Sequence, residues 1–286
     1  MGTGSRHELV AYNTATSSTN KIHDDEVARR YGFGGGLVPG VDVYAYMTRP
    51  AAEAWGLDWL RGGALRARFL RPVYDGRRVV VVAGEATDGP AGPTMAIEVR
   101  DEGDTVSATG EASLPTGAGD AAAEPAAAGP PPADRWAGPT GPAAEPSEAS
   151  PASLAPGTRL AGRPHRFVAA EAAGYLADVR EDLLLYAEHR VAHPGWLLRG
   201  ANHVLGVNVR LGPWIHVESA VRHHDLVRDG ETVQPRAVVT REWERKGHRF
   251  VELDVGLVTG DDRVAARITH TAIYRPRPPD PGPGGA

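Results

Sequence analysis

Residues 20–40 read Asn-Lys-Ile-His-Asp-Asp-Glu-Val-Ala-Arg-Arg-Tyr-Gly-Phe-Gly-Gly-Gly-Leu-Val-Pro-Gly. The acidic residues after His23 suit the first turn of a short helix over 24–31, because carboxylates stabilise the positive end of a helix dipole. The glycine run ends that helix, and Pro39-Gly40 opens a longer one over 41–55. The stretch therefore places a polar pair, Asn20 and His23, ahead of two predicted helices. On the N-terminal side of it, residues 8–16 could form one further short helix.

After Gly62-Gly63 the apolar residues recur every second position, which is typical of strands with one face on a core. Asp-Gly and Glu-Gly pairs supply the turns between these segments. The predicted strands cover residues 65–69, 79–86, 94–100 and 105–113. One long helix followed by four strands predicts an α+β unit, in which a helix packs on an antiparallel sheet.

The second half of the chain repeats this order. Helices are predicted over 167–178 and from Pro194-Gly195 onward, and strands over 158–162, 214–223, 232–243, 250–258 and 263–274. The turn at Asp75-Gly76 ends 36 residues after Gly40, and the turn at Asp229-Gly230 ends 35 residues after Gly195. A helix-plus-four-strand unit that occurs twice at nearly equal spacing predicts a duplicated domain.

Residues 116–157 separate the two halves and consist mainly of Ala, Pro, Gly, Ser and Glu, with Trp136 as the only aromatic residue. Such a segment buries too little apolar surface to offset its chain entropy. We therefore predict a disordered linker over 116–157, an N-terminal domain over 1–115, a C-terminal domain over 158–275 and a disordered tail over 276–286. A docking role for Trp136 is the alternative reading of the linker.

Composition excludes several classes of function. The 286 residues carry a net charge of -5, which argues against nucleic acid as a partner, and they include no cysteine, which excludes disulfides, thiolate nucleophiles and cysteine zinc sites. The sequence shows no secretory leader and no apolar run long enough to span a bilayer. We expect a cytoplasmic protein with no membrane partner.

The residues of the opening stretch indicate acid–base chemistry. A histidine near a helix N-terminus brings a general acid or base close to an amide-lined oxyanion site. The alternative is a surface histidine that happens to precede a glycine-rich loop.

The order Asn-x-Ile-His-x-Asp, Gly-Phe-x-Gly and then a glycine at a helix start resembles the signature of the MaoC-like, hotdog-fold acyl-thioester hydratases and dehydratases. The resemblance covers both halves of the chain. It implies a double hotdog, with two helix-plus-antiparallel-sheet units that share one continuous sheet. It also implies a hydro-lyase acting on an enoyl or 3-hydroxyacyl thioester of coenzyme A or acyl carrier protein, without a cofactor, and a possible homodimer of the double unit.

The family motif Asp-x-Asn-Pro-Ile-His can be carried over position by position. Asn20 and Ile22 match it, and His23 falls on the catalytic histidine. Gly40 falls on the helix-start glycine, so the resemblance implies that the amides of Gly40 and Val41 hold the thioester oxygen. Three positions depart from the family pattern, because its Asp falls on Ser18, its Pro on Lys21, and the His before the helix-start glycine on Pro39. Ser18 could orient a water but cannot act as a base unaided.

The second half supplies further candidates for the substrate pocket. Aligning Tyr186 with His23 places Glu181 opposite Ser18 and Leu183 opposite Asn20, so the second motif is degenerate and we expect a single site. The remaining pocket candidates lie on the two long helices, and they are Tyr44, Arg199, Asn202 and His203. The face of the second helix that carries the last three could border the site or face solvent.

Other polar groups are weaker candidates. His216, His223 and His224 do not predict a metal site, because strand alternation sends the last two to opposite faces. The arginines at 66, 68 and 71 indicate a solvated strand face, although they could meet the phosphates of coenzyme A or a carrier protein.

Two other functions remain open on this scaffold. The first is other chemistry, such as thioester hydrolysis or a cyclisation in natural-product or polyketide biosynthesis. The second is a non-catalytic module that binds an acyl thioester. The fold alone does not distinguish these functions from hydration, so the residues of the site have to distinguish them.

Overall fold

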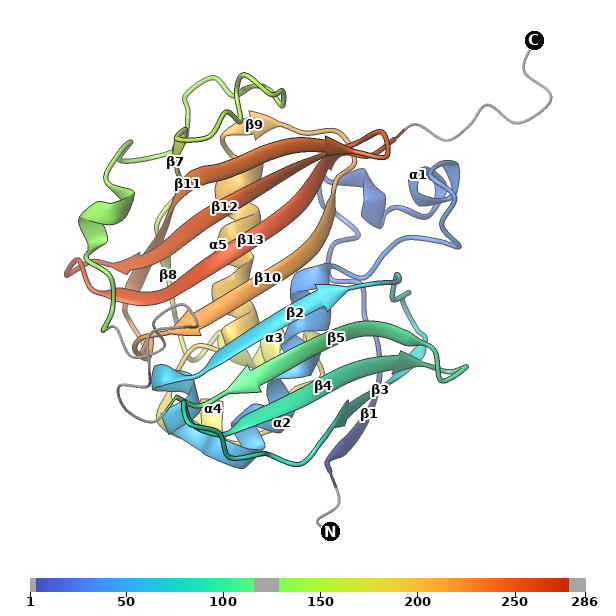
Figure 1. Cartoon of the computed structure of the whole chain (residues 1–286), viewed down its shortest axis with the longest axis vertical. Coiled ribbons are helices and arrows are strands. Elements are labelled where there is room, and N and C mark those ends of the chain that lie inside the picture. Colours follow the sequence, from blue (N-terminus) through green and yellow to red (C-terminus); the bar gives the residue numbers. More distant parts are fainter. Residues whose placement is uncertain (1–3, 116–128, 278–286) are drawn as a thin grey trace.

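The computed structural model describes residues 4–115 and 129–277, and one large antiparallel sheet dominates it. Figure 1 shows this sheet curving in front of two central helices, α2 (Gly40–Gly62) and α5 (Pro194–Gly206). In the N-terminal half its strands are β1 (Arg6–Val10), β2 (Ala64–Phe69), β3 (Arg78–Ala83), β4 (Thr94–Asp101) and β5 (Val106–Ser113). In the C-terminal half they are β7 (Arg159–Ala161), β8 (His165–Arg166), β10 (Ile215–His223), β11 (Thr232–Arg245), β12 (His248–Thr259) and β13 (Val264–Arg275).

The sheet consists of two units joined edge to edge. Its strand order is β1-β3-β4-β5-β2-β10-β13-β12-β11-β7, with β8 paired to β11. β2 and β10 pair antiparallel at the junction, from Glu218 opposite Arg68 to Arg222 opposite Ala64. Over these residues the two edges pair with each other, which protects both from unwanted strand pairing. The predicted double hotdog with one continuous sheet is confirmed.

The turns of the predicted repeat occupy equivalent places in the two units. Gly76 and Gly230 both have positive φ, 69° and 85°, a conformation that glycine adopts at no steric cost. An isolated bridge precedes each turn, Leu37 with Tyr74 in one unit and Val191 with Arg228 in the other. We propose the boundaries 1–115 and 158–275 for the two units on the basis of this correspondence.

Helix α2 lies against the sheet of its own unit and also against α5. Most of its residues between Val41 and Ala52 are buried, including Tyr44 and Met47 with no exposed surface. The predicted end at residue 55 coincides with a kink at Gly56, whose φ of 55° and ψ of -139° are not helical. A shorter continuation then leads into β2.

Two predicted helices differ from the structure. Residues 8–16 do not form a helix, because residues 6–10 form the edge strand β1 on β3. The helix predicted over 167–178 is confined to α3 (Ala172–Asp178), which has no buried residue. Phe167 instead follows β8 and packs its ring against Trp196 at a centroid distance of 5.3 Å. In both places contacts with a neighbouring strand or helix outweigh the local pattern.

The prediction of a disordered linker does not hold for residues 129–157, whereas residues 116–128 and most of the tail lie outside the described residues. The short helix η2 (Ala133–Trp136) lies on the outer face of β11 and β12. Trp136 is 1% exposed, packs with Val258 and Val264, and donates its indole N–H to the carbonyl oxygen of Asp254 at 3.0 Å. Composition was misleading because a few apolar side chains hold the segment, Trp136 on the sheet and Ala149 and Leu154 in the main core.

Replacing Trp136 with alanine should therefore lower the free energy of unfolding by about 3–5 kcal/mol, as expected for a buried tryptophan. Denaturant unfolding monitored by circular dichroism would measure this loss. Trp243→Ala is the matched control, because Trp243 is only partly buried and stacks on Phe250 at the sheet end. Equal stabilities for wild type and Trp136→Ala would restore the prediction of an undocked linker.

Candidate functional site

The site begins in the loop between β1 and α2, where Asn20 fixes the path of the chain. Its side-chain oxygen accepts hydrogen bonds from the backbone N–H groups of Ile22 and Trp214, and its amide donates to the carbonyl oxygen of Trp214 at 3.0 Å. Trp214 belongs to the other unit, just before β10. Asn20 therefore holds the short helix η1 (Lys21–His23) against the second unit.

His23 presents one unprotonated ring nitrogen to the cavity. Its Nδ1 lies 2.7 Å from the carbonyl oxygen of Leu37, which can only accept, so Nδ1 carries the proton. Its Nε2 then holds a lone pair and lies 3.3 Å from the amide nitrogen of Asn20. Burial lowers the pKa of His23, although the Leu37 carbonyl and the charge of Asp42 act in the opposite direction. A neutral imidazole with an available Nε2 is a general base at neutral pH.

The glycine run allows the chain to fold closely around His23. Helix α1 (Asp25–Arg30) lies between His23 and the glycine run. The side chain of Asp24 caps this helix by accepting from the N–H groups of Glu26 and Val27. A Cβ at Gly36 would lie 2.2 Å from the carbonyl oxygen of His23, so only glycine fits there. The resulting loop returns to Pro39, from which α2 starts.

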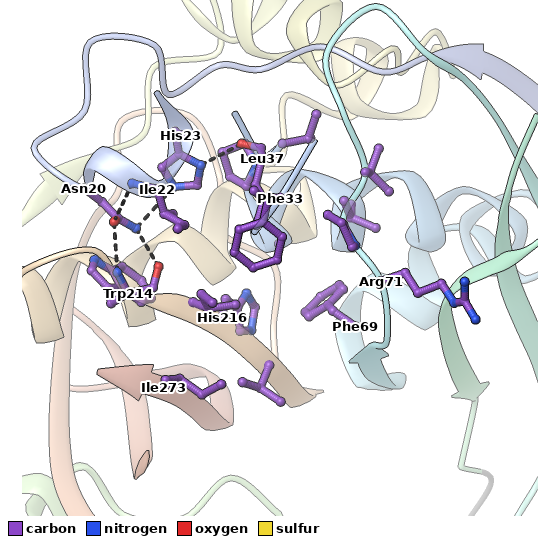
Figure 2. Close-up of a pocket in the computed structure, with 18 of the residues that line it drawn as sticks. Asn20, Ile22, His23, Phe33, Leu37, Phe69, Arg71, Trp214, His216 and Ile273 are labelled. Carbon is purple, nitrogen blue, oxygen red and sulfur yellow. Dashed lines mark hydrogen bonds between the residues drawn. The ribbon is translucent and has the colours of Figure 1, made fainter. Parts of the chain in front are cut away.

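Two neighbouring cavities share His23. The first, of about 190 Å³, is mostly apolar, and Figure 2 shows Phe33, His216 and Phe69 facing it between His23 and Arg71. The second, a groove of about 330 Å³, is more polar. The two have Asn20, His23, Pro39, Asn202 and Trp214 in common. None of the residues that line either cavity is an acid.

The N-terminus of α2 lies between these cavities. The N–H groups of Asp42 and Val43 both donate to the carbonyl oxygen of Pro39. The N–H groups of Gly40 and Val41 precede them and have no partner within the helix, as in the first turn of any helix. Gly40 lines the apolar cavity and Val41 lines the groove, so the positive end of the helix dipole faces the space beside His23.

The structure brings most of the predicted site residues together. Gly40 lines the apolar cavity. The other predicted residues that line the groove are Ser18, Asn20, His23, Val41, Arg199, Asn202 and His203. Ser18 accepts a hydrogen bond from the backbone N–H of Asn20 at 3.1 Å, so it shapes the turn. The side-chain oxygen of Asn202 is buried and has no partner among the described residues. Tyr44, by contrast, is fully buried in the main core and lines neither cavity.

The buried carboxylate of Asp42 acts electrostatically on His23, but other groups occupy its oxygens. Arg199 donates to one of them at 2.8 Å, and the hydroxyl of Thr14 donates to the other at 2.6 Å. Asp42 has no exposed surface, and it raises the already high pKa of Arg199. This ion pair joins α2 to α5 behind the groove and does not replace the carboxylate that is missing at Ser18.

Sequence reasoning missed several residues of the apolar cavity, above all His216. It also missed the aromatic side chains of Phe33 and Phe69 and the apolar Ile273. Arg71 is exposed at the cavity mouth, whereas Arg66 and Arg68 pair with Glu218. No local motif marks these residues, because three different strands and loops supply them.

The equivalent position in the second unit is filled with side chains. His193 precedes α5 and is buried with Glu181, their nitrogen and oxygen 3.6 Å apart. The Nδ1 atom of His193 accepts the N–H of Gly195, and its Nε2 also lies 3.3 Å from the hydroxyl of Thr48. Tyr186, aligned with His23, packs its ring against that of His193 at a centroid distance of 4.6 Å and an angle of 49°. Both nitrogens of His193 are thus engaged, and the geometry leaves no free base here.

Within residues 4–115 and 129–277, no group of three or more His, Asp or Glu side chains is arranged to hold a metal ion. In the same ranges no helix is both long and apolar enough to cross a membrane.

No protein-family model and no curated protein matches the sequence. Solved structures do match over nearly the whole chain. A protein from Chloroflexus aurantiacus, named for a MaoC dehydratase domain, has a TM-score of 0.63 at 12% identity, covering 96% of each chain. A Mycobacterium tuberculosis protein described as a double hotdog has a TM-score of 0.61 at 14% identity, again covering 96% of each chain.

A protein from Novosphingobium aromaticivorans that is named as a thioesterase is also similar, with a TM-score of 0.55 at 14% identity, covering 95% of this chain and 96% of that one. At such identities the likeness establishes the double hotdog fold. Because dehydratase and thioesterase names both occur among these structures, the reaction has to be argued from the site.

Proposed function

We propose that this protein is a hydratase or dehydratase for an acyl thioester, with His23 as its single general acid and base. The observation that carries the proposal is the unprotonated Nε2 of His23, which faces a cavity that also receives the N-terminus of α2. The substrate would be an enoyl or 3-hydroxyacyl thioester of coenzyme A or a carrier protein. Its thioester oxygen would accept from the amides of Gly40 and Val41.

One base is sufficient for this reaction if both proton transfers occur on one face of the substrate. His23 Nε2 takes a proton from water as the water oxygen bonds to the β-carbon, and the electron pair of the double bond moves toward the thioester oxygen. The imidazolium then returns that proton to the α-carbon, and the carbonyl re-forms. The helix amides stabilise the enolate oxygen between the two steps.

The groove supplies groups that could orient the water. The unpartnered oxygen of Asn202 can accept one water proton while His23 accepts the other. Neither Asn202 nor Ser18 can carry a proton away at neutral pH. The proposal therefore assigns all proton transfer to His23.

Thioester hydrolysis is the second candidate, and the absence of acids from both cavity linings favours it. Hydrolysis needs one base to activate water and an oxyanion site at the carbonyl, which are the two components present. The two reactions differ in products, since hydration keeps the thioester and hydrolysis releases a thiol.

A panel of trans-2-enoyl and 3-hydroxyacyl thioesters, with products identified by mass, tests the proposal. We expect gain or loss of one water with the thioester intact. Release of free thiol and carboxylic acid from the whole panel would replace the proposal with hydrolysis, and unchanged substrates would leave a binding module.

The pH dependence of kcat/KM should report the lowered pKa of His23. The base form is needed, so activity should fall as the pH drops through the pKa of His23 in the free enzyme. Because burial places this pKa below 6.5, the acidic midpoint should also lie below 6.5. Initial rates at constant ionic strength would measure it, and a midpoint above 6.5 would contradict the assignment.

A further inference from the structure

We propose that His216 is a second catalytic residue, which donates a hydrogen bond from its neutral Nδ1–H to the thioester carbonyl oxygen. The inference rests on the proposed binding of an acyl thioester at this site. It assigns a task to a histidine of the C-terminal unit, across the cavity from His23 (Figure 2).

His216 lies directly against the start of α2. A Cβ at Gly40 would be 2.7 Å from His216 Nδ1 and 3.0 Å from its Cγ. The residue is 7% exposed, lines the apolar cavity, and packs edge-on against Phe69. An oxygen held by the Gly40 amide would therefore have the His216 ring beside it.

A β-bulge explains this orientation. The pairing of β10 with β13 shifts register between His216 and Glu218. Ser219, Val221 and His223 are buried at alternate positions, and regular alternation would send His216 to the opposite face. The bulge turns it inward to the cavity, as bulges beside active sites often do.

The Nδ1 atom of His216 is buried and has no hydrogen-bond partner in the part of the chain that the structure describes. Its other nitrogen is engaged, because Nε2 lies 2.8 Å from the hydroxyl of Ser219. That hydroxyl lies 3.0 Å from Nδ1 of His270, a residue with no exposed surface. The three side chains form a buried row that ends at the cavity.

The row can set the tautomer of His216. A hydroxyl donates one proton and accepts through its lone pairs, so His270 Nδ1–H can donate to Ser219 while Ser219 donates to His216 Nε2. His216 then carries its proton on Nδ1, facing the cavity. A carbonyl oxygen accepts only, so a bound thioester selects this arrangement over the reverse one. Ser219 and His270 are thus positioning residues.

His216 acts as a neutral donor, because burial and the neighbouring His270 lower its pKa well below the ordinary value, although the backbone of Glu218 acts in the opposite direction. It complements the amide of Gly40 without adding a charge to the apolar cavity. The enolate oxygen would be stabilised by donors from both units, α2 of the first and β10 of the second.

Binding of two substrate analogues tests this without turnover. One is a coenzyme A ketone in which methylene replaces the thioester sulfur, and the other is the S-alkyl thioether, which lacks the carbonyl. Isothermal titration would give the ratio of their affinities for wild type, His216→Leu, Ser219→Ala and the control His223→Leu. His223 is also buried on β10 but lines neither cavity.

We expect wild type and His223→Leu to prefer the ketone to the same extent, because the amides of Gly40 and Val41 and the ring of His216 all donate to its carbonyl oxygen. His216→Leu should reduce the preference about tenfold, the value of one hydrogen bond, and the amides of Gly40 and Val41 should retain the rest. Ser219→Ala should reduce the preference by a smaller factor. ¹⁵N NMR should show protonated Nδ1 on His216 and His270 when the ketone binds wild type. In Ser219→Ala, ketone binding should no longer change the His270 signals, a loss that a purely structural role for Ser219 does not predict.

A wild-type protein that shows no preference for the ketone, or a preference that His216→Leu retains undiminished, would overturn the inference. If His216→Leu does not fold, Ser219→Ala and the NMR signals decide it. A preference for the ketone that His216→Leu reduces, in a protein that converts no thioester, would uphold the inference and refute the proposed reaction.

Discussion

Replacing His23 with glutamine should lower kcat by about 10²- to 10⁴-fold, the range for loss of a general acid or base. The effect is expected to be this large because His23 carries both proton transfers, and no Asp or Glu lines either cavity to take over. Glutamine keeps polar atoms near the Leu37 carbonyl and Asn20, so the loop should retain its shape. KM should change much less than kcat, as measured by steady-state kinetics on the best thioester of the panel.

His189→Gln is the matched control for this substitution. His189 is exposed in α4 (Leu185–His189) and lines neither cavity, so its replacement should leave both constants unchanged. If His23→Gln retained wild-type kcat, His23 would not be the base, whatever reaction the protein catalyses.

Replacing Gly40 with alanine should reduce kcat by about 10²-fold, the loss that a 1 Å misplacement of reacting groups can cause. The new methyl group would meet His216 at 2.7 Å from Nδ1 and 3.1 Å from Cβ. The histidine cannot easily move aside, because it is buried and held by Ser219. The start of α2, the ring, or both must shift, and the overpacking should also cost about 1–3 kcal/mol of stability.

Gly62→Ala tests whether this effect is local. Gly62 ends the same helix, and a Cβ there would meet nothing within 4 Å. It should leave kcat unchanged and stabilise the fold by about 0.5–1 kcal/mol through helix propensity. Wild-type activity in Gly40→Ala would show that the α2 N-terminus does not hold the substrate.

The repeat could be predicted from sequence because each unit marks its own elements locally. A proline–glycine pair starts each long helix, and an Asp-Gly turn follows at the same interval. The strand β1 and the residues that follow β8 were harder to predict. Each segment has only five or six residues with a weak apolar repeat, and contacts with neighbouring strands decide its secondary structure. Residues 129–157 show the same limit, because Trp136 finds its partners about 120 residues further along the chain.

The residues of the candidate site likewise differ in how far the sequence alone could identify them. Asn20, His23 and Gly40 could be predicted because a contiguous motif carries them. Arg199 and Asn202 could be placed on a helix, but the pattern could not say which neighbours their face would meet. Tyr44 belongs to a helix that is buried on almost every side near its start, so burial alone did not identify the cavity face.

His216 could not be found by pattern reasoning. Its position on the strand assigns it to the wrong face, and the bulge that corrects this leaves no local signal in the sequence. The residues whose contacts indicate a role for His216 are Gly40 and His270. They lie far from it in the chain, one on each side.

The central claim is that one histidine performs both proton transfers on an acyl thioester. Hydration of a trans-2-enoyl thioester in D₂O tests it most directly, with the relative configuration of the new C2 deuterium and C3 hydroxyl determined by proton NMR. A single base on one face predicts syn addition, with both groups delivered to the same side of the double bond. Anti addition would require a second acid on the opposite face, and it would contradict the account, as would the formation of no hydrated product.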